Sequence, residues 1–436
     1  MKFIHTADWH LGNTMHDIDR TRETEAFLKW LKTEIEETNA QALVIAGDIF
    51  DVPNPSNSAR NQYYSFLASL QGTSCSNVIV VGGNHDSGNM LDAPSEALKF
   101  LNVNVIGSIV NRNLDDLIFE LKDNSGNAIG ICCALPFMRD LEIEAYYKKA
   151  TPSQDETEGT DGSTEQQNLL QRLYSDAYAR AAEMRGDRDI PIIATGHLYA
   201  ANLEGRDTLD SDGEIQDDGV REVVGTLGNV MVDTFPKELD YVALGHIHYA
   251  TKVAGNSKIR YSGSPFVMGF DEANRKRNIL LVESQQGKEP EVQMRPVPQS
   301  VIQYKQIKGN LESLKTQLRD LEKELVANPI ETYVDILLTE NVLMNLENAL
   351  EEVENNKHFV VVRHRIERIT SSSAMPGKTG VESTKQFTKQ EYFKRLIANG
   401  LGKNLESDEV NNTYNEFLGL FNEALEYVEQ NQAESL

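Results

Sequence analysis

Seven side chains of the kinds that bind metal ions stand at the ends of short apolar runs in this 436-residue chain. They are two aspartates, one asparagine and four histidines: Asp8, His10, Asp48, Asn84, His197, His246 and His248. After four of the five runs, a glycine directly precedes the first of these residues. In an open α/β sheet, sites assemble at the edge where the carboxyl ends of the strands meet. We therefore expect the seven side chains to converge at one such edge.

This set of donors predicts a centre of two divalent metal ions. Asp, Asn and His without Cys suit manganese, iron, zinc or magnesium. Seven ligands are more than one tetrahedral or octahedral ion usually takes from protein, whereas two ions about 3.5–4 Å apart can share a carboxylate. Asp48 is the natural bridge, because a carboxylate has two oxygens to share. Such a pair activates water and neutralises charge on a phosphodiester as it reacts.

His85 lies one residue after the candidate ligand Asn84, so it can approach a substrate without binding metal. A general acid that protonates the leaving oxygen needs that placement. Other histidines have no expected role in the site. His5 lies inside the first apolar run and should be hydrogen-bonded in the core or at an edge, whereas His16 and His358 should be solvated.

Each motif taken alone has a commoner explanation. An Asp-x-His sequence is most often part of a surface turn, and Asn84-His85-Asp86 could form a hairpin or cap a helix. Five independent placements at strand ends would not coincide by chance, so we interpret them together.

Short apolar runs alternate with helical patterns up to about residue 290, which predicts α/β architecture. The expected strands are residues 3–5, 42–46, 78–81, 129–135, 192–194, 241–244 and 279–282. Helical periodicity is clearest at 20–38 and recurs at 169–185. The polar, acidic stretches 151–168 and 201–222 should form exposed loops.

Beyond residue 295 the pattern changes to a smaller β/α unit. Leucines at 311, 314, 318, 321 and 325 mark an amphipathic helix. We expect a strand at 333–338, a helix at 341–355 and a strand at 359–364. A linker follows at 371–386, and the tail should form two short helices that dock on a partner, because they bury too little core to fold alone.

Composition narrows the class of protein. The net charge is −25, from 42 Lys and Arg against 67 Asp and Glu, with 40% hydrophobic residues as in ordinary globular proteins. Such a charge repels phosphate at long range and disfavours whole-surface binding to nucleic acid or anionic lipid. A net −18 falls within 151–168, 201–222 and 401–436, so local recognition of phosphate elsewhere stays open.

Location follows from what the sequence lacks. No apolar run approaches the roughly 18 residues that cross a bilayer, and the first residues do not form a signal-peptide pattern. The three cysteines, Cys75, Cys132 and Cys133, are an odd number and should be buried inert thiols. We expect a cytoplasmic protein with no membrane span.

The motifs resemble, in order, the signature of the calcineurin-like metallophosphoesterases. They are Asp8-x-His10, Gly47-Asp48, Gly83-Asn84-His85-Asp86, Gly196-His197 and Gly245-His246-Ile247-His248. Segments 5–12, 46–51, 191–198 and 261–265 are similar, more closely, to the DNA nuclease subunits of bacterial nuclease–ATPase complexes. The similarity is close over roughly residues 1–290 and loose beyond.

The resemblance implies a layered α/β sandwich and assigns the site residues. One ion would be held by Asp8, His10, Asp48 and His248, and the other by Asp48, Asn84, His197 and His246. Manganese is the usual cofactor. His85 would be the catalytic histidine near the leaving group, with Asp86 orienting it.

The resemblance also implies the organisation and partners of the chain. A nuclease domain (1–292) would carry a β/α capping domain (295–370) that helps position DNA, and the segment 387–436 would bind an ATPase. Two nuclease subunits and two ATPase subunits would form a heterotetramer. The implied activity is exonuclease on double-stranded ends and endonuclease on single strands or hairpins, in DNA repair, recombination and replication. The alternatives are a phosphoesterase of small nucleotides or phosphoproteins, and a non-catalytic scaffold.

Overall fold

The computed structural model describes residues 1–150, 162–200, 230–339 and 358–366, together with a few single residues between 394 and 418. The chain divides into two compact units, Met1–Ile369 and Thr370–Leu436. The expected helix at 341–355, the linker at 371–386 and nearly all of the docking segment 387–436 lie outside the described residues. The account below concerns the first unit.

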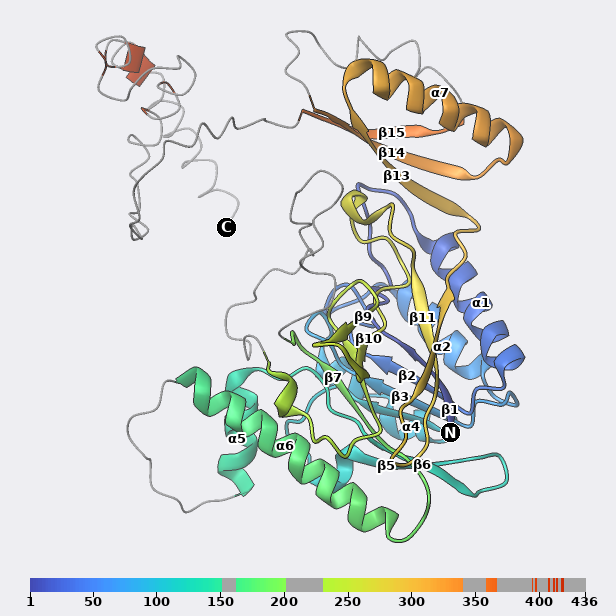
Figure 1. Cartoon of the computed structure of the whole chain (residues 1–436), viewed down its shortest axis with the longest axis vertical. Helices are drawn as coiled ribbons and strands as arrows, with labels where there is room; N and C mark the ends of the chain where they lie inside the picture. The colour runs from blue at the N-terminus through green and yellow to red at the C-terminus, as the bar shows by residue number, and fades with distance from the viewer. Residues whose placement is uncertain are drawn as a thin grey trace. The chain divides into compact units, whose positions relative to one another are not determined.

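Two six-stranded sheets form the body of this unit (Figure 1). The first has the order β12-β11-β1-β2-β3-β4, and its strands β1 to β4 run parallel. Their bounds are β1 Lys2–Thr6, β2 Ala42–Ala46, β3 Asn77–Val81, β4 Val103–Ile106, β11 Asn278–Glu283 and β12 Glu291–Pro296. β11 pairs antiparallel with β1, so a late strand of the chain borders the first one.

The second sheet has the order β5-β6-β7-β8-β10-β9, with β6, β7, β8 and β10 parallel. Its strands are β5 Ile118–Lys122, β6 Ala128–Cys133, β7 Ile192–His197, β8 Tyr241–Gly245, β9 Thr251–Val253 and β10 Asn256–Tyr261. The sheets pack face to face, with β2 against β7 and β8. All seven strands predicted before residue 290 are therefore confirmed, although they belong to two sheets.

Helices cover the outer faces of this sandwich. The α-helices of the described residues are α1 Thr21–Thr38, α2 Asn57–Ser69, α3 Gly88–Asp92, α4 Ser95–Lys99, α5 Asp140–Ala150, α6 Gly162–Arg185 and, in the small β/α unit rather than on the sandwich, α7 Leu311–Ala327. Short 3-10 turns are η1 Leu114–Leu117, η2 Val232–Thr234 and η3 Phe270–Glu272. Along β2, Val44 packs into the core between the sheets, whereas Leu43 and Ile45 pack toward α1 and α2. A strand buried on both faces must be apolar throughout, which explains its uninterrupted sequence.

One loop prediction needs correction. Residues 162–168, expected to be part of an exposed acidic loop, form the first turns of α6 instead. Helix propensity of Glu and Gln suffices there, because the helix continues into the apolar residues that pack on the second sheet. Residues 151–161 and 201–222 lie outside the described residues.

The small β/α unit forms the remaining layer. Its strands, β13 Ile302–Gly309, β14 Glu331–Leu338 and β15 Val360–Ile366, are parallel, and α7 covers them. The predicted leucines Leu314, Leu318, Leu321 and Leu325 are buried in its core. It contacts the sandwich where Tyr304 packs edge-on against Phe270, with ring centroids 5.9 Å apart.

The three cysteines are buried thiols, as the sequence predicts. Cys75, Cys132 and Cys133 are free and buried. Burial raises the pKa of Cys75 and of Cys133 to about 12, so these thiols are unreactive near neutral pH.

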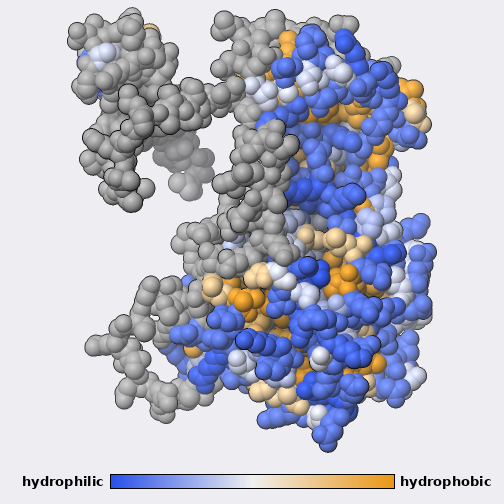
Figure 2. All heavy atoms as spheres, viewed as in Figure 1, coloured by the Kyte–Doolittle hydropathy of each residue, from blue (hydrophilic) through white to orange (hydrophobic). Residues whose placement is uncertain are grey.

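Figure 2 shows a mostly hydrophilic face with separate hydrophobic areas. None of the described helices is long and apolar enough to span a bilayer.

Candidate metal centre

The fold brings all seven candidate ligands together at the carboxyl ends of five strands. Four follow strands of the first sheet and three end or follow strands of the second: Asp8, His10, Asp48 and Asn84, then His197, His246 and His248. In two groups, Asp8–His10–His248 and Asp8–Asp48–His197, the donor atoms all lie within 4.8 Å of one another. The predicted single edge is therefore the shared edge of two packed sheets.

Asp48 and Asn84 connect the two halves of this cluster. Asp48 Oδ2 lies 3.5 Å from His10 Nε2 and 3.3 Å from His197 Nε2. Asn84 Oδ1 lies 3.0 Å from His197 Nε2 and 3.0 Å from His246 Nδ1. Asp48 thus has the position between two groups of donors that a shared ligand requires.

The backbone at four of these residues adopts the left-handed region. The φ angles are 55° at Asp8, 44° at His10, 50° at Asp48 and 100° at His246. This region costs a non-glycine residue about 1–2 kcal/mol. Surrounding hydrogen bonds hold the conformation: His246 N–H donates to Asp8 Oδ1 over 2.9 Å, and Asp8 N–H donates to Gly47 O over 3.0 Å. Such strain concentrates at functional sites.

The glycines that precede the ligands serve mainly close approach. A Cβ on Gly83 would lie 2.1 Å from Asp48 Oδ1, and one on Gly245 would lie 1.9 Å from Ala46 O. Only Gly47 combines this crowding with a left-handed backbone, at φ 93°. The glycines therefore allow strands and ligands to pack at distances that any side chain would prevent.

Burial and mutual charge shift the pKa values of the ligands in opposite directions. Burial alone would raise the pKa of Asp48, but the charges of His197 and His10 and a hydrogen bond from His197 lower it. Burial likewise acts to lower the pKa of His197, yet Asp48 and Asp8 raise it to about 9. Burial and the His197 charge lower the pKa of His246 to about 3. The pocket thus favours a proton on His197 beside Asp48 and disfavours one on His246.

A metal pair fits the polar atoms that the protein itself leaves unsatisfied. Asp8 Oδ2 and His10 Nε2 are buried without a hydrogen-bond partner in the described part of the chain. Burying such atoms unpaired costs about 1–3 kcal/mol each. Two carboxylates, one amide and four imidazoles are a donor set for borderline divalent ions. The residues present therefore fit the implied metals.

His85 and Asp86 are neighbours in sequence, but their side chains have different surroundings and different hydrogen-bond partners. The His85 side chain is exposed, and its Nδ1 lies 2.9 Å from the backbone oxygen of Asp51. Asp86 instead accepts hydrogen bonds from the backbone N–H groups of Ile49, Phe50 and Gly83. The hydrogen-bond partner of the His85 ring in the structure is therefore the Asp51 carbonyl, whereas the Asp86 carboxylate holds backbone N–H groups.

Sequence reasoning missed two acids beside the cluster. Asp51 Oδ1 lies 3.3 Å from His10 Nδ1, and Glu272 Oε1 lies 3.5 Å from His248 Nδ1. Asp51 follows Asp48 by three residues within a motif already recognised, so its position offered a signal. Glu272 lies in the turn η3, and no strand end marks it.

The segment Tyr261–Pro265 forms hydrogen bonds with the backbone close to two of the candidate ligands. Tyr261 Oη donates to Leu198 O over 2.7 Å and accepts from Ala200 N–H over 2.8 Å. Ser264 Oγ donates to Asp8 O over 2.7 Å. These bonds hold the loops that carry His197 and Asp8.

His5 is a core residue, as predicted. It is fully buried, with Nδ1 3.0 Å from Tyr241 Oη and Nε2 3.1 Å from Leu244 O. Burial lowers its pKa to about 3, although the hydrogen bond that the ring donates to Leu244 O partly opposes this shift. His16 is exposed, as expected, and His358 is exposed too.

His5 should make folding stability fall in mild acid. Above pH 6.5 the ring is neutral in both states; below it, protonation favours the unfolded chain by about 1.4 kcal/mol per pH unit down to about pH 3. Between pH 7 and pH 5, wild type should therefore lose about 2 kcal/mol more unfolding free energy than His5→Gln. Urea denaturation at both values measures this, with the exposed His16→Gln as control. An identical pH dependence in His5→Gln would refute the assignment.

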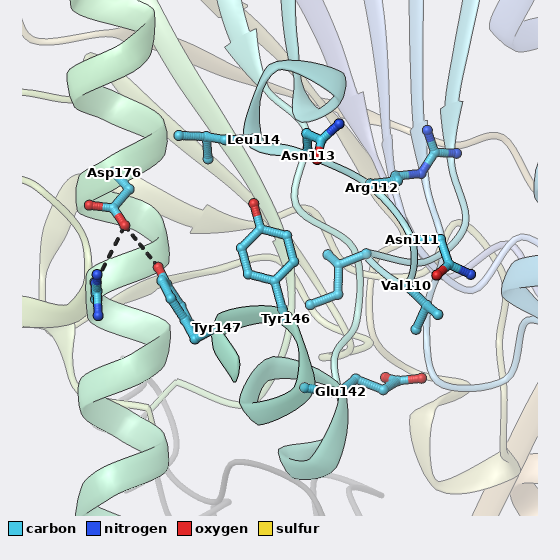
Figure 3. A pocket seen from close by; sticks show the side chains of 12 residues that line it. Val110, Asn111, Arg112, Asn113, Leu114, Glu142, Tyr146, Tyr147 and Asp176 are labelled. Atoms are coloured by element: carbon cyan, nitrogen blue, oxygen red, sulfur yellow. Dashed lines mark hydrogen bonds and ion pairs between the residues drawn. The ribbon is translucent and has the colours of Figure 1, made fainter. Parts of the chain in front are cut away.

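A cavity of about 480 Å³ lies between α5, α6 and the loop after β4, with no candidate ligand in its lining (Figure 3). Tyr146 projects into it, with Arg112 on one side and Tyr147 on the other. Asp176 accepts from Tyr147 Oη over 3.0 Å and lies 3.6 Å from Arg172 Nε. Asp176 and Arg172 therefore already form an ion pair with each other. The candidate active site is the ligand cluster and not this cavity.

The chain is similar to known proteins over most of its length. Residues 1–250 match the family model described as calcineurin-like phosphoesterase. The SbcD component of the nuclease SbcCD of Escherichia coli (strain K12) is 32% identical over 411 residues, which cover 91% of this chain and 93% of that protein. Proteins of the same name are 33% identical in Rhodobacter capsulatus, over 68% of this chain and 70% of that protein, and 29% identical in Bacillus subtilis, over 66% and 68%.

Proposed function

The chain belongs to the calcineurin-like phosphoesterases, and from this premise we propose that it is a metal-dependent DNA nuclease subunit. The observation that carries the proposal is the convergence of seven donors from five strands, in a chain that matches the SbcD component of the nuclease SbcCD over nine tenths of its length. We propose exonuclease activity on double-stranded ends and endonuclease activity on single strands or hairpins.

Two divalent ions, manganese in our proposal, would bind to the cluster. Asp8, His10, Asp48 and His248 would hold one ion, and Asp48, Asn84, His197 and His246 the other. Such a pair lowers the pKa of water and stabilises charge on a phosphodiester. The unpaired donors of Asp8 and His10 support this assignment.

The protein's own proton donor is His85. A carbonyl only accepts hydrogen bonds, so the contact with Asp51 O requires a proton on Nδ1 and leaves Nε2 directed elsewhere. In the imidazolium form, Nε2–H can protonate the oxygen that leaves when the phosphodiester is cleaved. Asp86 acts indirectly. Its carboxylate accepts hydrogen bonds from Ile49, which follows Asp48, and from Gly83, so it ties together the two loops that carry Asp48 and His85.

Partners follow from the same proposal. An SbcC-type ATPase would bind the segment 387–436, and two copies of each protein would form a heterotetramer in the cytoplasm. The complex would process DNA ends in repair, recombination and replication. The isolated chain should bind DNA weakly, because its net charge is −25.

The deciding experiment compares substrates on the purified full-length chain. With manganese we expect cleavage of linear duplex and hairpin DNA, and none when a chelator removes the metal. Bis(p-nitrophenyl) phosphate serves as the generic phosphodiester. A rate on that ester far above the rate on DNA ends would favour a phosphoesterase of small nucleotides instead, and metal binding without turnover would favour a scaffold. Adding the ATPase partner with and without ATP tests the assembly.

A further inference from the structure

A buried ion pair lies directly behind one of the candidate ligands. Glu272 Oε1 is 3.5 Å from His248 Nδ1, and Arg277 Nη2 is 3.1 Å from the other carboxylate oxygen of Glu272. Glu272 and Arg277 are each only 4% exposed. Buried charges this close to a site need a reason, because removing them from water is expensive.

Arg277 anchors this pair to the backbone on both sides. Its Nη1 donates to His248 O over 3.0 Å, and its Nη2 donates to Glu272 O over 2.7 Å. Glu272 belongs to the turn η3, whose Phe270 is buried beside Met15 and Tyr304. The carboxylate therefore has one fixed position relative to the His248 ring.

The histidines of the cluster differ in the group that lies within hydrogen-bonding or ion-pairing distance of their Nδ1 atom. His10 and His248 each face a carboxylate, from Asp51 and Glu272. The Nδ1 of His197 instead lies 2.9 Å from the backbone oxygen of Ala46. Both histidines of one proposed ion are thus supported by negative charge, and the ring nitrogen left for that ion is Nε2 in each.

We propose that Glu272 is a positioning residue, which fixes the tautomer and orientation of His248 for the ion held with Asp8 and His10. The inference rests on the proposed function. By accepting the Nδ1–H of His248, Glu272 would select the tautomer whose Nε2 lone pair is free to bind the metal. Such outer carboxylates typically strengthen metal binding about 10–100-fold. The effect should be confined to one of the two ions.

The test measures metal binding to the full-length protein after chelator treatment, without DNA. Manganese is titrated into the protein, and binding is measured by calorimetry and by the electron-spin-resonance signal of free Mn²⁺. The titration gives a dissociation constant for each ion. Glu272→Gln keeps the shape, and Arg277 keeps its two backbone acceptors, so the variant should fold. We expect one ion to bind about 10–100-fold more weakly and the other within about threefold of wild type. Asp271→Asn, the same charge change at the exposed neighbouring residue, is the control.

Three outcomes would overturn the inference, and they are distinguishable. Two unchanged dissociation constants in Glu272→Gln would show that the carboxylate does not act on the metal. Equal weakening of both ions with a lowered melting temperature would show a general structural role. Failure of wild type itself to bind manganese would refute the proposed function and the inference with it.

Discussion

His85→Ala is expected to slow cleavage of linear duplex DNA by about 10²–10⁴-fold while metal stoichiometry and melting temperature stay at wild-type values. His85 is exposed, is not one of the seven proposed ligands, and lies with its ring 4.8 Å from that of His10. Its loss therefore removes the proton donor and leaves the ligands in place. The cleavage rate is measured under single-turnover conditions with manganese, and the number of bound metal ions is measured on the same samples.

A substrate that needs no proton on its leaving group sharpens this test. The p-nitrophenyl ester of thymidine 5′-phosphate releases a stable phenolate, so the variant should lose far less rate on it than on DNA. His16→Ala, at an exposed histidine that is not among the candidate ligands, is the control. Full activity of His85→Ala on DNA, or equal losses on both substrates, would remove His85 as the general acid.

Asp48→Asn should abolish nuclease activity by removing both ions. Asp48 lies between the two donor groups, and the amide keeps the shape and the oxygen that accepts from His85 N–H over 2.9 Å. Loss of the shared negative charge should weaken both ions at least about 100-fold, more than loss of an outer carboxylate. Manganese titration and the duplex assay measure the two effects.

The contrast with His85→Ala identifies the role of Asp48. Asp48→Asn must lose metal and activity together, whereas His85→Ala loses activity alone. Asp187→Asn, at an exposed acid, controls for the charge change. Retention of two tightly bound ions by Asp48→Asn would show that this carboxylate is not shared.

The positions of the ligands could be predicted because each follows an apolar run that is buried on both faces. Val44 and Leu43 illustrate this pattern, since they pack on opposite faces of β2. The division into two sheets could not be predicted, because apolar runs do not record which strands pair. β11 beside β1 is the clearest example.

Residues that support the ligands were harder to find. Asp86 carries the same side chain as a histidine-orienting acid, and only the positions of three backbone N–H groups show its actual partners. Glu272 reaches His248 across 24 residues from a turn without periodicity. His5 was predictable from its place inside an apolar run, where a buried ring must find polar partners.

The pairing of β1 with β11 also determines when this protein can fold during synthesis. The ribosome makes Lys2 281 residues before its partner Glu283 (283 − 2 = 281). Until then, β1 has an unpaired edge and the contacts that complete the first sheet are missing, a condition that exposes nascent chains to aggregation. His248 is also translated before that strand. The metal centre should therefore mature late, so a chain stalled between about residues 250 and 280 would carry every ligand yet lack β11, the strand that completes the first sheet.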